Sequence, residues 1–160
     1  SSIGFYSNSI VNPLQKAYAK KLGEMSGYED YQLFLVNSGA EAIENAVKLA
    51  AFHNQRKKIL VFEKGFHGRT SMAVQATDNP NIQTSLDHND RIIRIPLNDR
   101  GKLSEGLNDD ISCVIIEGIQ GVGGFNVPAS DFLSLLREKC DACCTLLILD
   151  EIQSGFGRTG

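Results

Sequence analysis

The chain has 160 residues, of which 42% are hydrophobic and 22% are charged, and its formal net charge is −3. This composition is typical of a globular domain with a substantial core, and it gives no electrostatic reason to expect binding to nucleic acid or to an anionic membrane. No apolar run approaches the ~20 residues of a membrane-spanning helix, and residues 1–10 do not resemble a signal peptide.

The first third of the chain predicts two helices separated by a strand. Asn12, followed by a proline, is a favourable N-cap, and Gly27 is suited to end that helix. A short apolar run predicts a strand at 33–36. Ser38 and Glu41 have the spacing of a capping box, and apolar residues then recur at helical intervals. The apolar face of the first helix is expected to consist of Leu14, Ala17, Leu22 and Met25.

The rest of the chain alternates apolar runs with helical patterns. A polar loop is expected at 78–90, and a helix is expected at 128–139 with Phe132, Leu135 and Leu136 facing a core. Strands are expected at 59–62, 91–95, 112–117 and 145–149. Strands that alternate with helices predict an α/β fold with a mostly parallel sheet in a single domain.

Three of the four cysteines are clustered, since Cys140, Cys143 and Cys144 lie close together and only Cys113 is remote. The cluster is compatible with a metal or redox site. No second pair and no nearby histidine has the spacing of a zinc site, however, so we predict reduced, mostly buried thiols and no metal. Reduced thiols favour a cytoplasmic location.

The segment Val36-Asn37-Ser38-Gly39-Ala40-Glu41 is a candidate anion site. A strand is expected to end there and a helix to begin, so free N–H groups and the positive end of the helix dipole meet. Gly39 and Ala40 would allow a phosphate to approach the backbone. The segment has neither the G-x-G-x-x-G pattern nor a P-loop lysine, which disfavours a dinucleotide or a nucleoside triphosphate. A simple capped helix is the alternative.

Polar residues also follow the predicted strands at 59–62 and 112–117. After the first of these, Phe66 could stack on a flat ring, His67 is a structural donor or an acid–base group, and Arg69 could bind a carboxylate in bidentate fashion. At the end of the other, Glu117 precedes a glycine-rich run. A solvated loop and a simple turn are the alternatives for these two segments.

The last predicted strand ends in Asp150, and Gln153 follows shortly after. A carboxylate at a buried strand end needs a cationic partner, because an unpaired buried charge is costly. A protonated pyridine nitrogen would be such a partner, and an acidic strand end that faces solvent is the alternative. Loops after parallel strands share one edge of the sheet, so the four segments together predict a site for a planar, phosphorylated, cationic heterocycle.

The combination N-S-G-A-E-A, F-H-G-R-T, I-E-G-I-Q-G and L-D-E-I-Q-S-G-F-G-R-T-G resembles the class III pyridoxal-phosphate (PLP) aminotransferases. The resemblance runs from about Asn8 to Gly160 with the motifs in family order. It implies the large, cofactor-binding domain of a type I PLP-dependent transferase, with its sheet flanked by helices.

The resemblance also implies a role for each motif residue. Asp150 would pair with the pyridinium nitrogen as a catalytic residue. Arg69 would bind the substrate carboxylate, and Glu117 would support the pocket wall. The residues expected to bind the cofactor are Ser38, Gly39, Ala40, Phe66, His67, Asp150, Glu151, Ile152 and Gln153.

By the same resemblance, the reaction is transfer of the ω-amino group of N-acetylornithine or N-succinylornithine to 2-oxoglutarate, in arginine biosynthesis. Family members are cytoplasmic homodimers that act on small molecules. A related aminotransferase acting on ornithine or 4-aminobutyrate is the runner-up. A non-catalytic phosphate-binding module is an alternative from a different functional class.

The chain departs from the family pattern at two points. Val122 stands where the family often has a glutamate that gates the substrate-binding arginine, so we expect an altered substrate pocket. The Schiff-base lysine of the family lies beyond the last motif, and none of the lysines in this chain matches it. We therefore expect residues 1–160 to be a truncated large domain without the C-terminal small domain, and to be inactive alone.

Overall fold

The computed structural model describes residues 12–159, which fall into two compact units. The first unit ends at Asn37 and the second begins at Ser38. None of the helices among residues 12–159 is both long and apolar enough to cross a membrane.

The first unit contains one helix, α1 (Pro13–Ser26). Its N-cap is Asn12, whose Oδ1 accepts a hydrogen bond from Leu14 N at 2.9 Å, and it ends at Gly27 with φ of 77°. Both ends agree with the prediction. The predicted apolar face is not buried, because Leu14 and Met25 are 71% and 75% exposed.

The strand predicted at 33–36 is wrong. This segment is irregular, and the paired strands of the described chain all belong to the second unit. A strand needs a neighbour to complete its backbone ladder, and a run of four apolar residues does not reveal whether such a neighbour exists.

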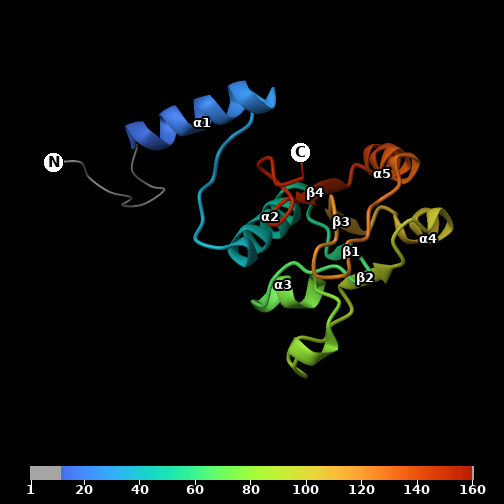
Figure 1. Ribbon diagram of the computed structural model, residues 1–160. Helices are drawn as coiled ribbons and strands as arrows, with labels where there is room; N and C mark the ends of the chain where they lie inside the picture. Colours follow the sequence, from blue (N-terminus) through green and yellow to red (C-terminus); the bar gives the residue numbers. More distant parts are fainter. Residues whose placement is uncertain (1–11, 160) are drawn as a thin grey trace. The chain divides into compact units, whose positions relative to one another are not determined.

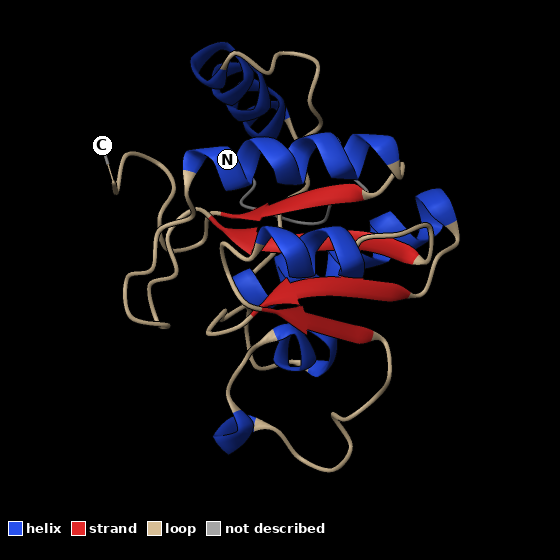
Figure 2. Ribbon diagram, turned by 90° about the vertical axis from the view of Figure 1, so that its right-hand side faces the viewer, coloured by secondary structure: helices blue, strands red, loops and turns tan. Residues whose placement is uncertain are grey.

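The second unit is built on a parallel sheet whose strand order is β2-β1-β3-β4 (Figure 2). The strands are β1 (Lys58–Phe62), β2 (Ile92–Ile95), β3 (Ile111–Glu117) and β4 (Leu146–Asp150). Every residue of β3 is buried, as expected for a strand covered by helices on both faces. The predicted α/β fold with a parallel sheet is confirmed.

Helices cover both faces of this sheet, with α2 and α3 on one face and α4 and α5 on the other (Figure 1). Their bounds are α2 (Gly39–Asn54), α3 (Ser71–Ala76), α4 (Arg100–Gly106) and α5 (Ser130–Ala142). Alternate residues of β1 serve the two cores, since Leu60 and Phe62 pack with α4 and α5 whereas Ile59 and Val61 pack with α2 and α3.

The sequence predicted α2 and α5 but not the two shorter helices. Ser38 caps α2 as predicted, with its Oγ accepting from Glu41 N at 3.2 Å. The signal for α4 is an Asp99 cap followed by Leu103 and Leu107, one turn apart and both buried. The loop predicted at 78–90 contains a single short 3-10 turn, Pro80–Ile82.

The strand order creates a topological switch point. From β1 the chain turns to one side to form β2, and then crosses to the other side to form β3 and β4. Ligands of open α/β sheets bind in the crevice that such a reversal opens at the carboxyl ends of the strands. The loops that follow β1 and β3 flank that crevice.

At the amino ends of the strands, Arg56 connects several segments of the chain. It follows the end of α2. Its Nη1 donates to Cys143 O at 2.8 Å and lies 3.2 Å from Ile111 O and 3.3 Å from Thr145 Oγ1. The guanidinium thus joins the end of α2 to the beginnings of β3 and β4.

We expect Arg56→Ala to lower the free energy of unfolding by about 1–3 kcal/mol, because part-buried carbonyl groups lose their donor. The matched control is Arg100→Ala, which removes an exposed ion pair with Asp131 and should change stability by less than about 1 kcal/mol. Urea denaturation of the full-length protein measures both, and equal effects of the two substitutions would contradict the role of Arg56.

Candidate active site

A buried histidine–aspartate pair lies at the carboxyl edge of the sheet. His67 Nδ1 is 2.7 Å from Asp150 Oδ2, and their side chains are only 1% and 4% exposed. The other carboxylate oxygen of Asp150 accepts from Ile152 N at 3.1 Å. The alternative prediction, in which Asp150 faces solvent, is therefore wrong. The strand β4 ends beneath the loop that follows β1.

Glu117 is a second buried carboxylate, beside this pair. It stands opposite Asp150 in the β3–β4 register and accepts from Phe66 N at 2.9 Å and from Gly121 N at 3.4 Å. Burial raises the pKa of Glu117 and the charge of Asp150 adds to the rise, whereas both N–H groups and the charge of His67 act in the opposite direction. Glu117 therefore connects the loops that follow β1 and β3.

The start of α2 adjoins the segment that follows β4. Ser38 satisfies the N–H of Glu41, and the Ser38 carbonyl accepts from Ala42, so the N–H groups of Gly39 and Ala40 precede the helical bonding pattern. A Cβ atom at Gly39 would lie 2.8 Å from the side chain of Ile152. The candidate anion site and the Asp150 segment are thus in contact.

Gln153 and Glu151, which follow Asp150 in the last motif, are exposed. The side chain of Gln153 lies against Gly121, where an added Cβ would be 1.9 Å from Gln153 Oε1. Glu151 is also exposed, and its carbonyl accepts from Gly155 N at 2.9 Å. The glycine run after β3 therefore makes room for the segment after β4.

Arg69 is exposed, and among residues 12–159 no ion pair or hydrogen bond is recorded for its guanidinium. Gly68 precedes it with φ of 131°, a conformation that strongly favours glycine. A Cβ at Gly68 would also lie 2.7 Å from Ala40 Cβ, so the loop packs directly on the first turn of α2.

Sequence analysis missed Thr77, a fully buried residue that holds the loop after β1. Its Oγ1 accepts from His67 N at 2.9 Å and lies 3.0 Å from the carbonyl oxygens of Gly68 and Ala73. The neighbouring Asp78 accepts from Lys64 N at 2.7 Å. Nothing in the local pattern of a single threonine signals such contacts.

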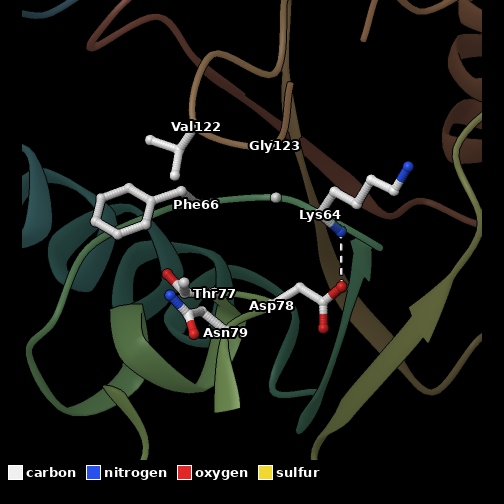
Figure 3. A pocket seen from close by; sticks show the side chains of 8 residues that line it. Lys64, Phe66, Thr77, Asp78, Asn79, Val122 and Gly123 are labelled. Carbon is white, nitrogen blue, oxygen red and sulfur yellow. Dashed lines mark hydrogen bonds between the residues drawn. The ribbon is translucent and has the colours of Figure 1, made fainter. Parts of the chain in front are cut away.

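A cavity of about 180 Å³ adjoins Phe66. In Figure 3 the ring of Phe66 and the side chain of Val122 lie on one side, Asn79 lies opposite, and the ammonium group of Lys64 points away from the ring. The loops around the cavity interlock closely, since a Cβ at Gly123 would lie 2.2 Å from Lys64 O.

The cysteines belong to the framework rather than to this edge. All four are free, and Cys113 and Cys140 are buried among the residues of the two cores. Burial raises the pKa of Cys113 to about 12 and that of Cys140 to about 11, so both are thiols at neutral pH. Cys143 is half-buried and Cys144 is exposed, so the prediction of mostly buried thiols holds for the first two only.

Residues 2–160 match the class-III aminotransferase family along almost the whole chain. The chain belongs to this family. The resemblance carried by the four motifs is thereby confirmed.

The chain is 39% identical over 155 residues to an acetylornithine aminotransferase from Methanopyrus kandleri. The match covers 96% of the chain but only 40% of that relative. The chain thus spans less than half the length of this relative.

Solved structures of aminotransferases share the fold. The ornithine aminotransferase of Toxoplasma gondii superposes with a TM-score of 0.82 at 30% identity, over 92% of the chain and 37% of that structure. An amine transaminase from an uncultivated Pseudomonas species, solved in a PLP-bound form, superposes with a TM-score of 0.84 at 25% identity, over 94% and 41%.

Because the pKa of Glu117 is raised, we expect the effect of Glu117→Gln on the free energy of unfolding to depend on pH. Since the native pKa lies above its ordinary value of 4.5, the folded protein holds this proton more firmly than the unfolded chain does. The stabilising contribution of that proton is therefore lost as pH rises through the native pKa. The glutamine keeps an acceptor for the N–H of Phe66 and does not titrate.

We expect the loss of unfolding free energy in Glu117→Gln to be largest near pH 4.5 and to shrink toward neutral pH. Denaturant titrations of the full-length variant and wild type over this range measure the difference. The charged groups that act on Glu117 are His67 and Asp150. A loss that grows with pH would show that the native pKa is lowered instead.

Proposed function

We propose that the full-length protein is a PLP-dependent aminotransferase that transfers the ω-amino group of N-acetylornithine or N-succinylornithine to 2-oxoglutarate. The observation that carries the proposal is the buried carboxylate of Asp150, paired with His67 on one oxygen and with a single backbone N–H on the other. This carboxylate lies at the carboxyl end of the sheet. The first turn of α2, with the N–H groups of Gly39 and Ala40, lies at the same end.

The surroundings of Asp150 fit a protonated ring nitrogen. Among the described residues no lysine or arginine forms an ion pair with Asp150, and each carboxylate oxygen has a lone pair beyond the one that accepts from His67 or from Ile152. A buried carboxylate with spare acceptor capacity favours a cationic donor. When bound, PLP would act as an electron sink for the bonds at the amino-bearing carbon of the substrate.

His67 would hold the carboxylate of Asp150 in the correct orientation. Its Nδ1 lies against the carboxylate, and its backbone N–H is held by Thr77, so the imidazole has little freedom to turn away. Phe66, whose N–H is fixed by Glu117, would present its ring to one face of the pyridine.

Ser38, Gly39 and Ala40 would bind the phosphate group. The N–H groups of Gly39 and Ala40 precede the helical bonding of α2, and the dipole of this helix of 16 residues favours an anion there. Ile152, in contact with Gly39, would cover an apolar part of the cofactor. Glu151 and Gln153 complete the proposed set, with Gln153 as a donor to the ring substituent.

Arg69 would bind the carboxylate of the substrate, since its exposed guanidinium is available for a bidentate contact. The name of the Methanopyrus kandleri relative supports an N-acyl-ornithine substrate. The structural likeness to an ornithine aminotransferase keeps free ornithine as the second candidate.

We further propose that residues 1–160 form part of the large domain of a longer cytoplasmic protein that acts in arginine biosynthesis. Its other segments would supply the Schiff-base lysine and the small domain. Two copies would associate as a homodimer, as the resemblance to the family implies.

The test is an assay of glutamate formation by the full-length protein with N-acetylornithine, N-succinylornithine, ornithine and 4-aminobutyrate as donors. We expect the two acylated donors to be preferred, and Asp150→Asn to lower kcat by about a hundredfold or more because the ring nitrogen loses its counter-charge. The matched control is Asp110→Asn, which removes an exposed ion pair with Lys58 before β3.

A preference for ornithine or 4-aminobutyrate would overturn the substrate assignment. An absence of amino transfer from every donor would overturn the proposed function. Full activity of Asp150→Asn would remove Asp150 from the catalytic machinery.

We expect substitution of Val122 to change the substrate preference. Val122 is 61% exposed beside the cavity at Phe66, so a glutamate there would add a charge at the rim without disturbing the core. We expect Val122→Glu to alter the ratio of kcat/KM for N-acetylornithine and N-succinylornithine by about tenfold, chiefly by repelling the anionic succinyl group. An unchanged ratio, measured in the full-length protein, would exclude Val122 as a determinant of this choice.

A further inference from the structure

Glu44 holds the loop that carries Arg69, although it lies outside every motif considered above. Its Oε1 accepts three hydrogen bonds, from Thr70 Oγ1 at 2.9 Å, from Met72 N at 2.7 Å and from Ala73 N at 3.2 Å. Glu44 belongs to α2, and these donors lie in the first turn of α3 and just before it.

The start of α3 depends on this contact. Thr70 occupies the N-cap position but makes no capping hydrogen bond within its own helix, and its hydroxyl donates to Glu44 instead. The first N–H groups of a helix have no intrahelical acceptor, so a carboxylate from a neighbouring helix replaces the missing cap.

Arg69 is therefore anchored on both sides by the same helix. On its N-terminal side Gly68 packs against Ala40, and on its C-terminal side Thr70 is bound by Glu44. Ala40 and Glu44 are four residues apart and so lie on one face of α2. The backbone of Arg69 is fixed, whereas its guanidinium remains exposed.

We propose that Glu44 is a positioning residue that fixes the direction in which Arg69 presents its guanidinium to the carboxylate of the amino donor. The proposal rests on the role of Arg69 given under the proposed function. Because α2 also provides the N–H groups of Gly39 and Ala40, this helix would set the distance between the phosphate site and the carboxylate site.

The test compares two amino donors that differ only in this carboxylate. They are N-acetylornithine and N-acetyl-1,4-diaminobutane, which is the same molecule without its α-carboxylate. In the full-length protein we expect Glu44→Ala to raise KM for N-acetylornithine by about tenfold, because a small displacement of a substrate-binding group is costly. We expect KM for the decarboxylated donor to be unchanged.

Two variants control for a general loss of structure. Glu44→Gln keeps an acceptor oxygen at the same position and should restore most of the affinity. Asp99→Ala removes the cap of α4, where Asp99 accepts from Lys102 N at 2.9 Å, and should leave both KM values unchanged. In an Arg69→Ala background, Glu44→Ala should have no further effect on N-acetylornithine.

An equilibrium measurement completes the test. Calorimetric binding of 2-acetamidopentanoate, which has the carboxylate and acyl group but no reacting amine, should weaken about tenfold in Glu44→Ala. An equal rise in KM for both donors, or an undiminished effect of Glu44→Ala without Arg69, would overturn the proposal and leave the proposed function intact. An inactive wild type would overturn both.

Discussion

The site depends on one negative charge that the fold places below the surface. Asp150 ends a strand in the sheet and is almost fully buried, so its carboxylate must be paired or hydrogen-bonded there. His67 provides the pairing, but it comes from the loop after another strand. That loop must therefore fold back over the sheet edge, and the hydroxyl of Thr77 holds it in place. The geometry of the remaining site residues follows from this path.

Contacts between the loops make the site a connected unit. Ile152 packs on Gly39, Gln153 packs on Gly121, and Glu117 binds the backbone of the loop after β1. Each of these contacts thus joins two segments that lie far apart in the sequence. Positions set by such mutual contacts are more rigid than those of separate loops, and rigid positions are what a preorganised site requires.

The sequence predicted the parallel sheet well because strands buried on both faces appear as apolar runs, and motif spacing placed the carboxylates at their ends. It failed at 33–36, where the apolar run is irregular and does not belong to the sheet. It also missed Thr77 and Glu44, because each acts through a neighbour brought close by the fold. Thr77 is ten residues from His67, and Glu44 is 26 residues from Thr70. Local sequence patterns indicate which residues are buried and where helices are capped. Hydrogen bonds between residues far apart in the sequence can be seen only in the folded structure.

The glycine run after β3 limits how this site can diversify. Gly123 is too close to the backbone of Lys64 to accept a side chain, and Gly124 has a φ of 103° that disfavours one. Val122 can vary without moving the backbone, whereas a side chain at Gly121 would first require Gln153 to shift. Changes of a single codon at position 122 would therefore alter the rim of the cavity while the path of this loop stays the same.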